Sequence, residues 1–172
     1  MPEKELVIAE AEIAKRVKEL GAAITKDFEG GQLLVVGILN GAFMFMADLV
    51  REIKLEIAVD FVRVASYGMG TTPGILRFTK DIELDIREKN ILVVEDIIDT
   101  GRTLAHLKRS FEERGARSVR FCTLLDKKER REVDIFIDYV GFAVQSGFLV
   151  GYGLDCRERF RNLHEVYQLK EA

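Results

Sequence analysis

Two uninterrupted apolar runs constrain the fold more than any other feature of the sequence. Residues 33–39 (LLVVGIL) and 91–94 (ILVV) have the length of strands and contain no charged side chain. Strands that are covered on both faces show such runs, as in parallel sheets. Helical spacing of apolar residues follows both runs, at residues 42–50 and 102–114. The chain is therefore predicted to be an α/β protein whose mostly parallel sheet is flanked by helices.

The other elements follow from the same patterns. A helix is predicted over residues 10–28, where apolar residues recur at helical spacing. Residues 57–65, rich in β-branched side chains, and 75–79 are predicted as the two strands of a hairpin. Three further strands are predicted over residues 118–125, 133–139 and 147–152.

Composition and charge exclude several classes of partner. The formal net charge is -3, which gives no electrostatic basis for nucleic acid as the main partner. No apolar stretch reaches the ~20 residues of a membrane helix, and the charged residues 1–5 do not resemble a signal peptide. Cys122 and Cys156 lack the spacing of a disulfide framework or a metal site. These features predict a cytoplasmic protein with no membrane partner.

The segment from Val93 to Leu104 carries the chemistry. An apolar strand leads into the acid pair Glu95 and Asp96, and a third acid, Asp99, precedes a glycine-containing turn and a helix. Ligands bind at the carboxyl ends of strands in such sheets, and a helix N-terminus offers N–H groups to phosphate. The acid pair can accept hydrogen bonds from ribose hydroxyls or hold hydrated Mg²⁺. The plainer alternative is a helix cap and two solvated acids, but the ordered pattern favours a phosphate site.

This segment resembles the phosphoribosyl pyrophosphate signature of type I phosphoribosyltransferases, in the form found in their hypoxanthine-guanine branch. Residues 36–49 resemble the pyrophosphate loop of that branch and the helix after it. Residues 59–67 resemble the strand that leads into its mobile loop, and residues 148–163 its base-binding hood. The resemblance implies a single phosphoribosyltransferase domain over residues 1–172, with a core at about 33–130, a mobile loop at about 66–80 and a hood at about 140–172.

The resemblance implies how the activated sugar is held. Glu95 and Asp96 would contact the ribose hydroxyls, and Asp99 would be the general base that takes a proton from the purine imidazole ring. The 5-phosphate would lie on the turn made by Ile98, Thr100, Gly101, Arg102 and Thr103.

The pyrophosphate end departs from the family in one residue. Asn40 and Gly41 match the pyrophosphate loop, but the family commonly has lysine where this chain has Asn40. Backbone donors, next to the cis peptide known in relatives, would then bind the diphosphate in place of a side-chain charge. Arg161 is the candidate for neutralising pyrophosphate.

The resemblance also implies the base site, the metal and the lid. Lys127 would donate to the 6-oxo group, with Lys128 as the alternative register, and Phe148 would stack on the purine beside the backbone of Leu149. Asp155 would also belong to the base site. Mg²⁺ would be held by Glu95 and Asp96, with a second ion at Asp155. Ser66 and Tyr67 would belong to the loop that closes over the reacting centre.

The expected activity is transfer of the 5-phosphoribosyl group from phosphoribosyl pyrophosphate to hypoxanthine or guanine, giving IMP or GMP. Two alternatives stay open at this point. Some proteins of this fold are regulators that bind RNA or DNA, and a third 6-oxopurine, xanthine, is a possible substrate. Relatives are dimers or tetramers, so a homo-oligomer is expected. His106 and His164 have no partners at metal-ligand spacing and are expected to be surface or packing residues.

Overall fold

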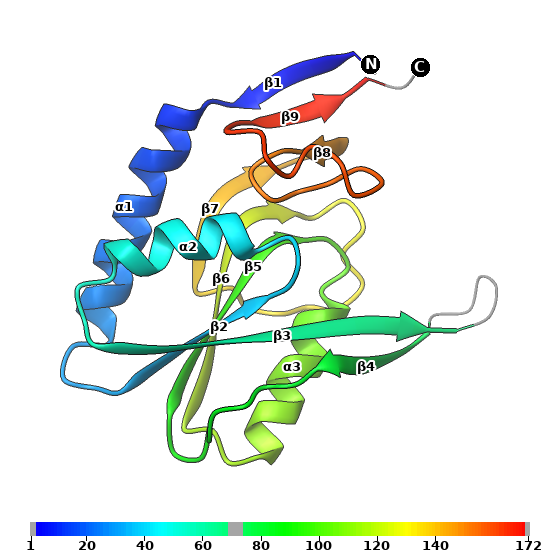
Figure 1. Cartoon of the computed structure of the whole chain (residues 1–172). Helices are drawn as coiled ribbons and strands as arrows, with labels where there is room; N and C mark the ends of the chain where they lie inside the picture. Colours follow the sequence, from blue (N-terminus) through cyan, green and yellow to red (C-terminus); the bar gives the residue numbers. More distant parts are fainter. Residues whose placement is uncertain (1–2, 69–73, 171–172) are drawn as a thin grey trace.

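The computed structural model describes residues 3–68 and 74–170 (Figure 1). The chain alternates strands and helices through its first two thirds and ends in short strands. Its elements, in chain order, are β1 (Lys4–Ile8), α1 (Glu10–Asp27), β2 (Leu33–Ile38), α2 (Phe43–Glu52), β3 (Ile57–Tyr67), β4 (Ile75–Lys80), β5 (Asn90–Ile98), α3 (Arg102–Glu113), β6 (Ser118–Lys127), β7 (Tyr139–Val144), β8 (Phe148–Val150) and β9 (Val166–Leu169).

A six-stranded sheet forms the centre of the molecule, in the order β4-β3-β2-β5-β6-β7. Every neighbouring pair is parallel except β3 and β4, which form an antiparallel hairpin. Helices α1 and α2 pack on one face and α3 on the other, and each face has its own apolar core (Figure 1). The prediction of an α/β fold with a mostly parallel sheet is confirmed, because the fully apolar runs are the inner strands β2 and β5.

A smaller three-stranded antiparallel sheet, in the order β1-β9-β8, lies beyond the core (Figure 1). It draws on both ends of the chain, and the sequence had placed the hood mainly in the C-terminal part. Neither β1 nor β9 was predicted, because the first has a single buried residue and the second only four residues. In addition, β7 belongs to the large sheet, so the small sheet begins later than residue 140.

The strand predicted over residues 133–139 is wrong. Strand β7 begins only at Tyr139, and the residues before it run outside the sheet. Ile135 and Ile137 alternate with polar residues as in a strand, but they pack against the core around α3. The Asp138 side chain accepts the N–H of Phe121 on β6 at 2.8 Å, just before the pairing of β6 with β7 begins. Alternation of apolar residues therefore reflected contact with a helix rather than a strand in the sheet.

The predicted hairpin is present, but it is longer than expected and shortens the loop. Ser66 and Tyr67, expected in the mobile loop, are the last residues of β3 and pair with Leu76 and Ile75 of β4. Residues 69–73 of that predicted loop lie outside the described residues. Among the residues that the structure describes, no helix has both the length and the apolar character to cross a membrane.

Candidate active site

The carboxyl ends of β2 and β5 bring the predicted pyrophosphate loop against the acid pair. A Cβ atom added at Gly41 would lie 1.9 Å from Oδ2 of Asp96, so a side chain at this position would displace the carboxylate of Asp96. The peptide between Leu39 and Asn40 is cis, as the resemblance implied. Two segments that are more than fifty residues apart in sequence thus share one small region of the surface.

The acid pair is electrostatically unbalanced. Burial of its side chain, and then the nearby charge of Asp96, raise the pKa of Glu95 well above its ordinary value. Each carboxylate accepts a hydrogen bond from a backbone N–H group: Asp96 N donates to Glu95 Oε1 at 3.0 Å and Ile97 N to Asp96 Oδ1 at 2.8 Å. Since two close carboxylates repel each other, this site favours a cation or hydroxyl donors from a ligand.

The phosphate turn that the sequence predicted lines a cavity at the start of α3. Gly101 is the residue before the helix and has a φ of 84°, the left-handed region where glycine is favoured. The cavity has a volume of about 120 Å³. Its lining combines an acid of the pair, the third acid and the turn itself: Glu95, Ile97, Ile98, Asp99, Thr100, Gly101, Thr103 and Leu104.

Arg102 stands apart from this lining. Its guanidinium group points to the turn end of the β3–β4 hairpin, where Nη2 donates to the carbonyl of Gly74 at 3.1 Å. Its backbone N–H donates to Oγ1 of Thr100 at 3.3 Å. Arg102 therefore contributes its backbone to the phosphate turn, whereas its guanidinium charge lies outside the turn.

Asp99 has one paired and one unpaired carboxylate oxygen. Oδ2 lies 3.3 Å from Nη1 of Arg130. Oδ1 is buried and has no hydrogen-bond partner among the described residues. Because a buried acceptor without a donor is costly, a donor supplied by a ligand would be favoured there.

The predicted base-site residues meet at Gly147. Nζ of Lys127 donates to the Gly147 carbonyl at 3.0 Å, and its side chain is 13% exposed. Phe148 follows on β8 and is 54% exposed, so its ring is free to stack, whereas Leu149 is buried. Lys128 is exposed, which favours the register that puts Lys127 in the site.

Asp155 and Arg161 pair with each other. Nη2 of Arg161 lies 3.0 Å from Oδ1 of Asp155, and Nη1 donates to the Gly153 carbonyl at 2.8 Å. Within residues 3–68 and 74–170, no group of three or more His, Cys, Asp and Glu side chains is arranged to hold a metal ion. Asp155 is therefore not joined to Glu95 and Asp96 in one metal cluster.

Sequence reasoning missed the role of two arginines. Neither Arg130 nor Arg131 was among the residues that the sequence assigned to the site, and of the two only Arg131 is largely covered, with a side chain that is 18% exposed. Arg130 pairs with Asp99, and Arg131 contacts Oδ1 of Asp126 at 2.5 Å and the Asp99 carbonyl at 3.0 Å. The available signal was Asp126 itself, an acid at the end of a buried strand, which is 7% exposed and needs a partner.

Comparison with known proteins agrees with this geometry. Residues 7–157 match the family model of the phosphoribosyl transferase domain. The chain is 46% identical to the hypoxanthine phosphoribosyltransferase of Salmonella typhimurium, over 94% of this chain and 93% of that protein. It is also 46% identical to the hypoxanthine-guanine phosphoribosyltransferase of Streptococcus pneumoniae, over 98% of this chain and 94% of that protein.

A solved structure shows the same fold. The crystal structure of a hypoxanthine phosphoribosyltransferase from Staphylococcus aureus superposes with a TM-score of 0.93 at 43% sequence identity. The match covers 96% of this chain and 91% of that one. The turn, the acid pair and the glycine loop thus occur in a protein that belongs to the phosphoribosyltransferase family.

Proposed function

We propose that the protein transfers the 5-phosphoribosyl group from phosphoribosyl pyrophosphate to hypoxanthine or guanine, giving IMP or GMP and pyrophosphate. The relatives named above carry these bases in their names. The observation that carries the proposal is the cavity of about 120 Å³, because the phosphate turn and the carboxylate of Glu95 line one space. A phosphate seated at the start of α3 would set its ribose over the acid pair.

The proposed reaction needs positioning and charge stabilisation rather than a protein nucleophile. The bond between the sugar C1 and the pyrophosphate oxygen breaks, and pyrophosphate leaves with the electron pair. The purine imidazole nitrogen forms the new bond to C1 and passes its proton to Asp99. The unpaired Oδ1 of Asp99 supports this role, since it is an acceptor without a donor. The carboxylates also stabilise the positive charge that develops on the sugar.

Magnesium is proposed as the cofactor. Glu95 and Asp96 offer only carboxylate oxygen, the donor that Mg²⁺ prefers, and burial together with the nearby charge of Asp96 raises the pKa of Glu95. These two residues would hold the ion on the ribose side, and Asp155 would contribute to a second site in place of its ion pair with Arg161. Bound magnesium would offset the charge of the diphosphate.

Lys127 is proposed to select 6-oxopurines. Its ammonium group donates to a 6-oxo group and would meet no acceptor in the 6-amino group of adenine. Lys127 contacts the carbonyl of Gly147, and the exposed Phe148 is the next residue in the chain, which supports a base that stacks on the ring while its edge meets the lysine. Ser66 and Tyr67, at the end of β3, are proposed to cover the reacting centre.

The test is turnover with a panel of bases. Hypoxanthine, guanine, xanthine and adenine would each be supplied with phosphoribosyl pyrophosphate and Mg²⁺, and nucleotide and pyrophosphate would be measured. We expect product from hypoxanthine or guanine, none from adenine, and loss of product when a chelator removes the metal. Absence of turnover with every base, together with binding of RNA, would identify a regulator instead.

A further inference from the structure

The turn Gly151–Tyr152–Gly153 presses the hood against the pyrophosphate loop. These three successive residues have φ angles of 100°, 50° and 99°. Positive φ is unusual for a bulky residue and costs free energy, so such a tyrosine persists only where its surroundings impose the conformation. A Cβ added at Gly153 would lie 2.2 Å from the carbonyl oxygen of Gly41. The backbone of the turn is thus in direct contact with the loop.

Contacts continue from this turn to the acid pair. Gly41 separates Gly153 from Asp96, since its own Cβ position lies 1.9 Å from Oδ2 of that acid. Hood, pyrophosphate loop and acidic strand end are therefore stacked through two glycines with no side chain between them. Displacement of the turn would shift the peptide groups of the loop.

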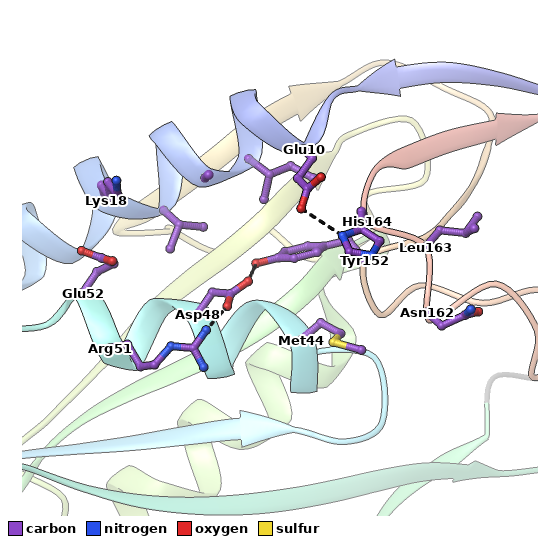
Figure 2. Close-up of a pocket in the computed structure, with 13 residues that line it drawn as sticks. Glu10, Lys18, Met44, Asp48, Arg51, Glu52, Tyr152, Asn162, Leu163 and His164 are labelled. Carbon is purple, nitrogen blue, oxygen red and sulfur yellow. Dashed lines mark hydrogen bonds and ion pairs between the residues drawn. The ribbon is translucent and has the colours of Figure 1, made fainter.

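The Tyr152 side chain anchors the turn to α2. Its ring lies between α1 and α2, and its hydroxyl donates a hydrogen bond to Oδ2 of Asp48 (Figure 2). The other oxygen of Asp48 pairs with Arg51. Burial raises the pKa of Tyr152, and the bond to Asp48 raises it further, so the hydroxyl stays protonated and remains a donor.

A cavity lies beside the Tyr152 ring. A cavity of about 400 Å³ opens beside Tyr152 between α1, α2 and the hood, with Met44 and Leu163 among its lining residues (Figure 2). The Tyr152 ring belongs to the apolar core that the hood shares with α1 and α2, and its hydroxyl adds a specific hydrogen bond to Asp48 on α2. The backbone N–H of Tyr152 adds one bond to Leu163 within the hood, at 2.9 Å, but none to α2.

We propose that Tyr152 is a positioning residue for the pyrophosphate end of the reaction. Its bond to Asp48 fixes the turn on α2, the helix that follows the loop, and so holds Gly153 against Gly41. The loop then presents its peptide groups in the orientation that binds diphosphate, which matters here because Asn40 brings no positive charge. This inference rests on the proposed function, since it assigns the bound group as pyrophosphate.

The test removes one hydroxyl and compares it with a matched control. Tyr139 also donates to an aspartate, Asp27, at 2.7 Å, and is 7% exposed against 8% for Tyr152. It joins β7 to the end of α1, whereas Tyr152 contacts the α2 side of the loop. Tyr152→Phe and Tyr139→Phe therefore make the same chemical change at two joints, and both would be measured for turnover and for unfolding by denaturant.

We expect Tyr152→Phe to raise KM for phosphoribosyl pyrophosphate about 3–10-fold, the effect of one hydrogen bond. The Kd for magnesium pyrophosphate should rise to the same extent, while KM for the base stays within about twofold. Tyr139→Phe should leave all three constants within about twofold. Equal effects of the two variants on the pyrophosphate constants would overturn the proposal.

Asp48 supplies the second arm of the experiment. Asp48→Asn keeps an acceptor for the hydroxyl and should preserve pyrophosphate affinity, whereas Asp48→Ala should reproduce Tyr152→Phe. The double variant Tyr152→Phe with Asp48→Ala should be no weaker than either single variant, because both remove one bond. Additive losses would refute a shared contact.

If the unaltered protein turned over no base, the proposed function would fail, while calorimetric titration with magnesium pyrophosphate would still decide the role of Tyr152.

Discussion

Asp99, the proposed general base, is held by contacts with two arginines. One carboxylate oxygen lies 3.3 Å from Arg130, and the other is buried without a hydrogen-bond partner among the described residues. Nε of Arg131 donates to its carbonyl at 3.0 Å, which fixes the backbone beneath it. The arginines therefore orient the acid while they leave one of its carboxylate oxygens without a hydrogen-bond partner among the described residues.

Asp99→Asn tests that oxygen. The amide keeps the shape of the side chain but cannot accept a proton at neutral pH, so turnover should fall by ~10²–10⁴-fold. Steady-state kinetics would measure the loss, and binding of IMP or GMP should change far less. An unaltered rate would remove Asp99 from proton transfer.

At this scale the sequence predicted residues that are contiguous and missed those that only the fold brings near. Glu95, Asp96 and Asp99 were identified together because an apolar strand, an acid pair and a turn follow one another within ten residues. Arg130 and Arg131 reach Asp99 from some thirty residues away, across a loop whose path no local pattern describes. Their charge alone was typical of a solvated surface.

The hairpin of β3 and β4 is closed at its base by a buried carboxylate. Asp60 on β3 accepts the N–H groups of Glu83 and Leu84 at 2.7 and 2.9 Å, and that of Phe61 at 2.7 Å. Nζ of Lys80 lies 3.5 Å away. Burial raises the pKa of Asp60, but the three backbone donors and the lysine outweigh it, so the pKa lies below the ordinary 3.8.

Asp60→Asn should therefore destabilise the protein in a pH-dependent way. At pH 7 the free energy of unfolding should fall by about 1.5–3 kcal/mol, the range for a hydrogen bond to a charged group. A lowered folded-state pKa means that the contribution is complete above 3.8 and disappears as pH falls through the folded value. Denaturant titrations between pH 7 and pH 3 should show the difference between variant and parent narrowing in acid.

A surface aspartate provides the control for that experiment. Asp85 also has a lowered pKa, about 2, because Arg87 donates to it, but both side chains are exposed. Asp85→Asn should leave the unfolding midpoint nearly unchanged at every pH. A loss as large as that of Asp60→Asn would show that burial of the carboxylate is not what matters.

Elements with strong periodicity were predicted well, and elements whose pattern serves another contact were not. Strands β2 and β5 and helix α3 followed directly from apolar spacing. Residues 133–139 have the alternation of a strand, but their apolar side chains face the core around α3. Such a segment can be distinguished from a strand only by knowing what lies beside it.

At the scale of the whole molecule, the first and last strands, β1 and β9, pair with each other in the small sheet. Ile8, at the end of β1, is 5% exposed and lies in the same core cluster as Leu149, Tyr152 and Val166. This cluster continues into the α1 and α2 face of the large sheet. The small sheet and the core thus share one apolar interior, and no local sequence signal links residues so far apart.

Ile8→Ala should weaken that shared interior. We expect a loss of about 2–5 kcal/mol in the free energy of unfolding, as for other buried large-to-small changes. Leu6→Ala, in the same strand but 54% exposed, should cost less than about 0.5 kcal/mol. Denaturant unfolding measures both, and faster hydrogen exchange of the amides of β9 in Ile8→Ala alone would place the weakening in the small sheet. Equal costs for the two variants would contradict this account.

The adjacency of β1 and β9 has a consequence for how the protein would be degraded. The N–H of Lys170 donates to the carbonyl of Glu3 at 2.9 Å, and the two ends of the chain emerge side by side (Figure 1). Removal of residues from either end by an exopeptidase would separate the same three strands, β1, β9 and β8. Because β8 pairs with β9, Phe148, the residue proposed to stack on the base, would lose its support first, so we expect the proposed base site to be lost before the central sheet unfolds.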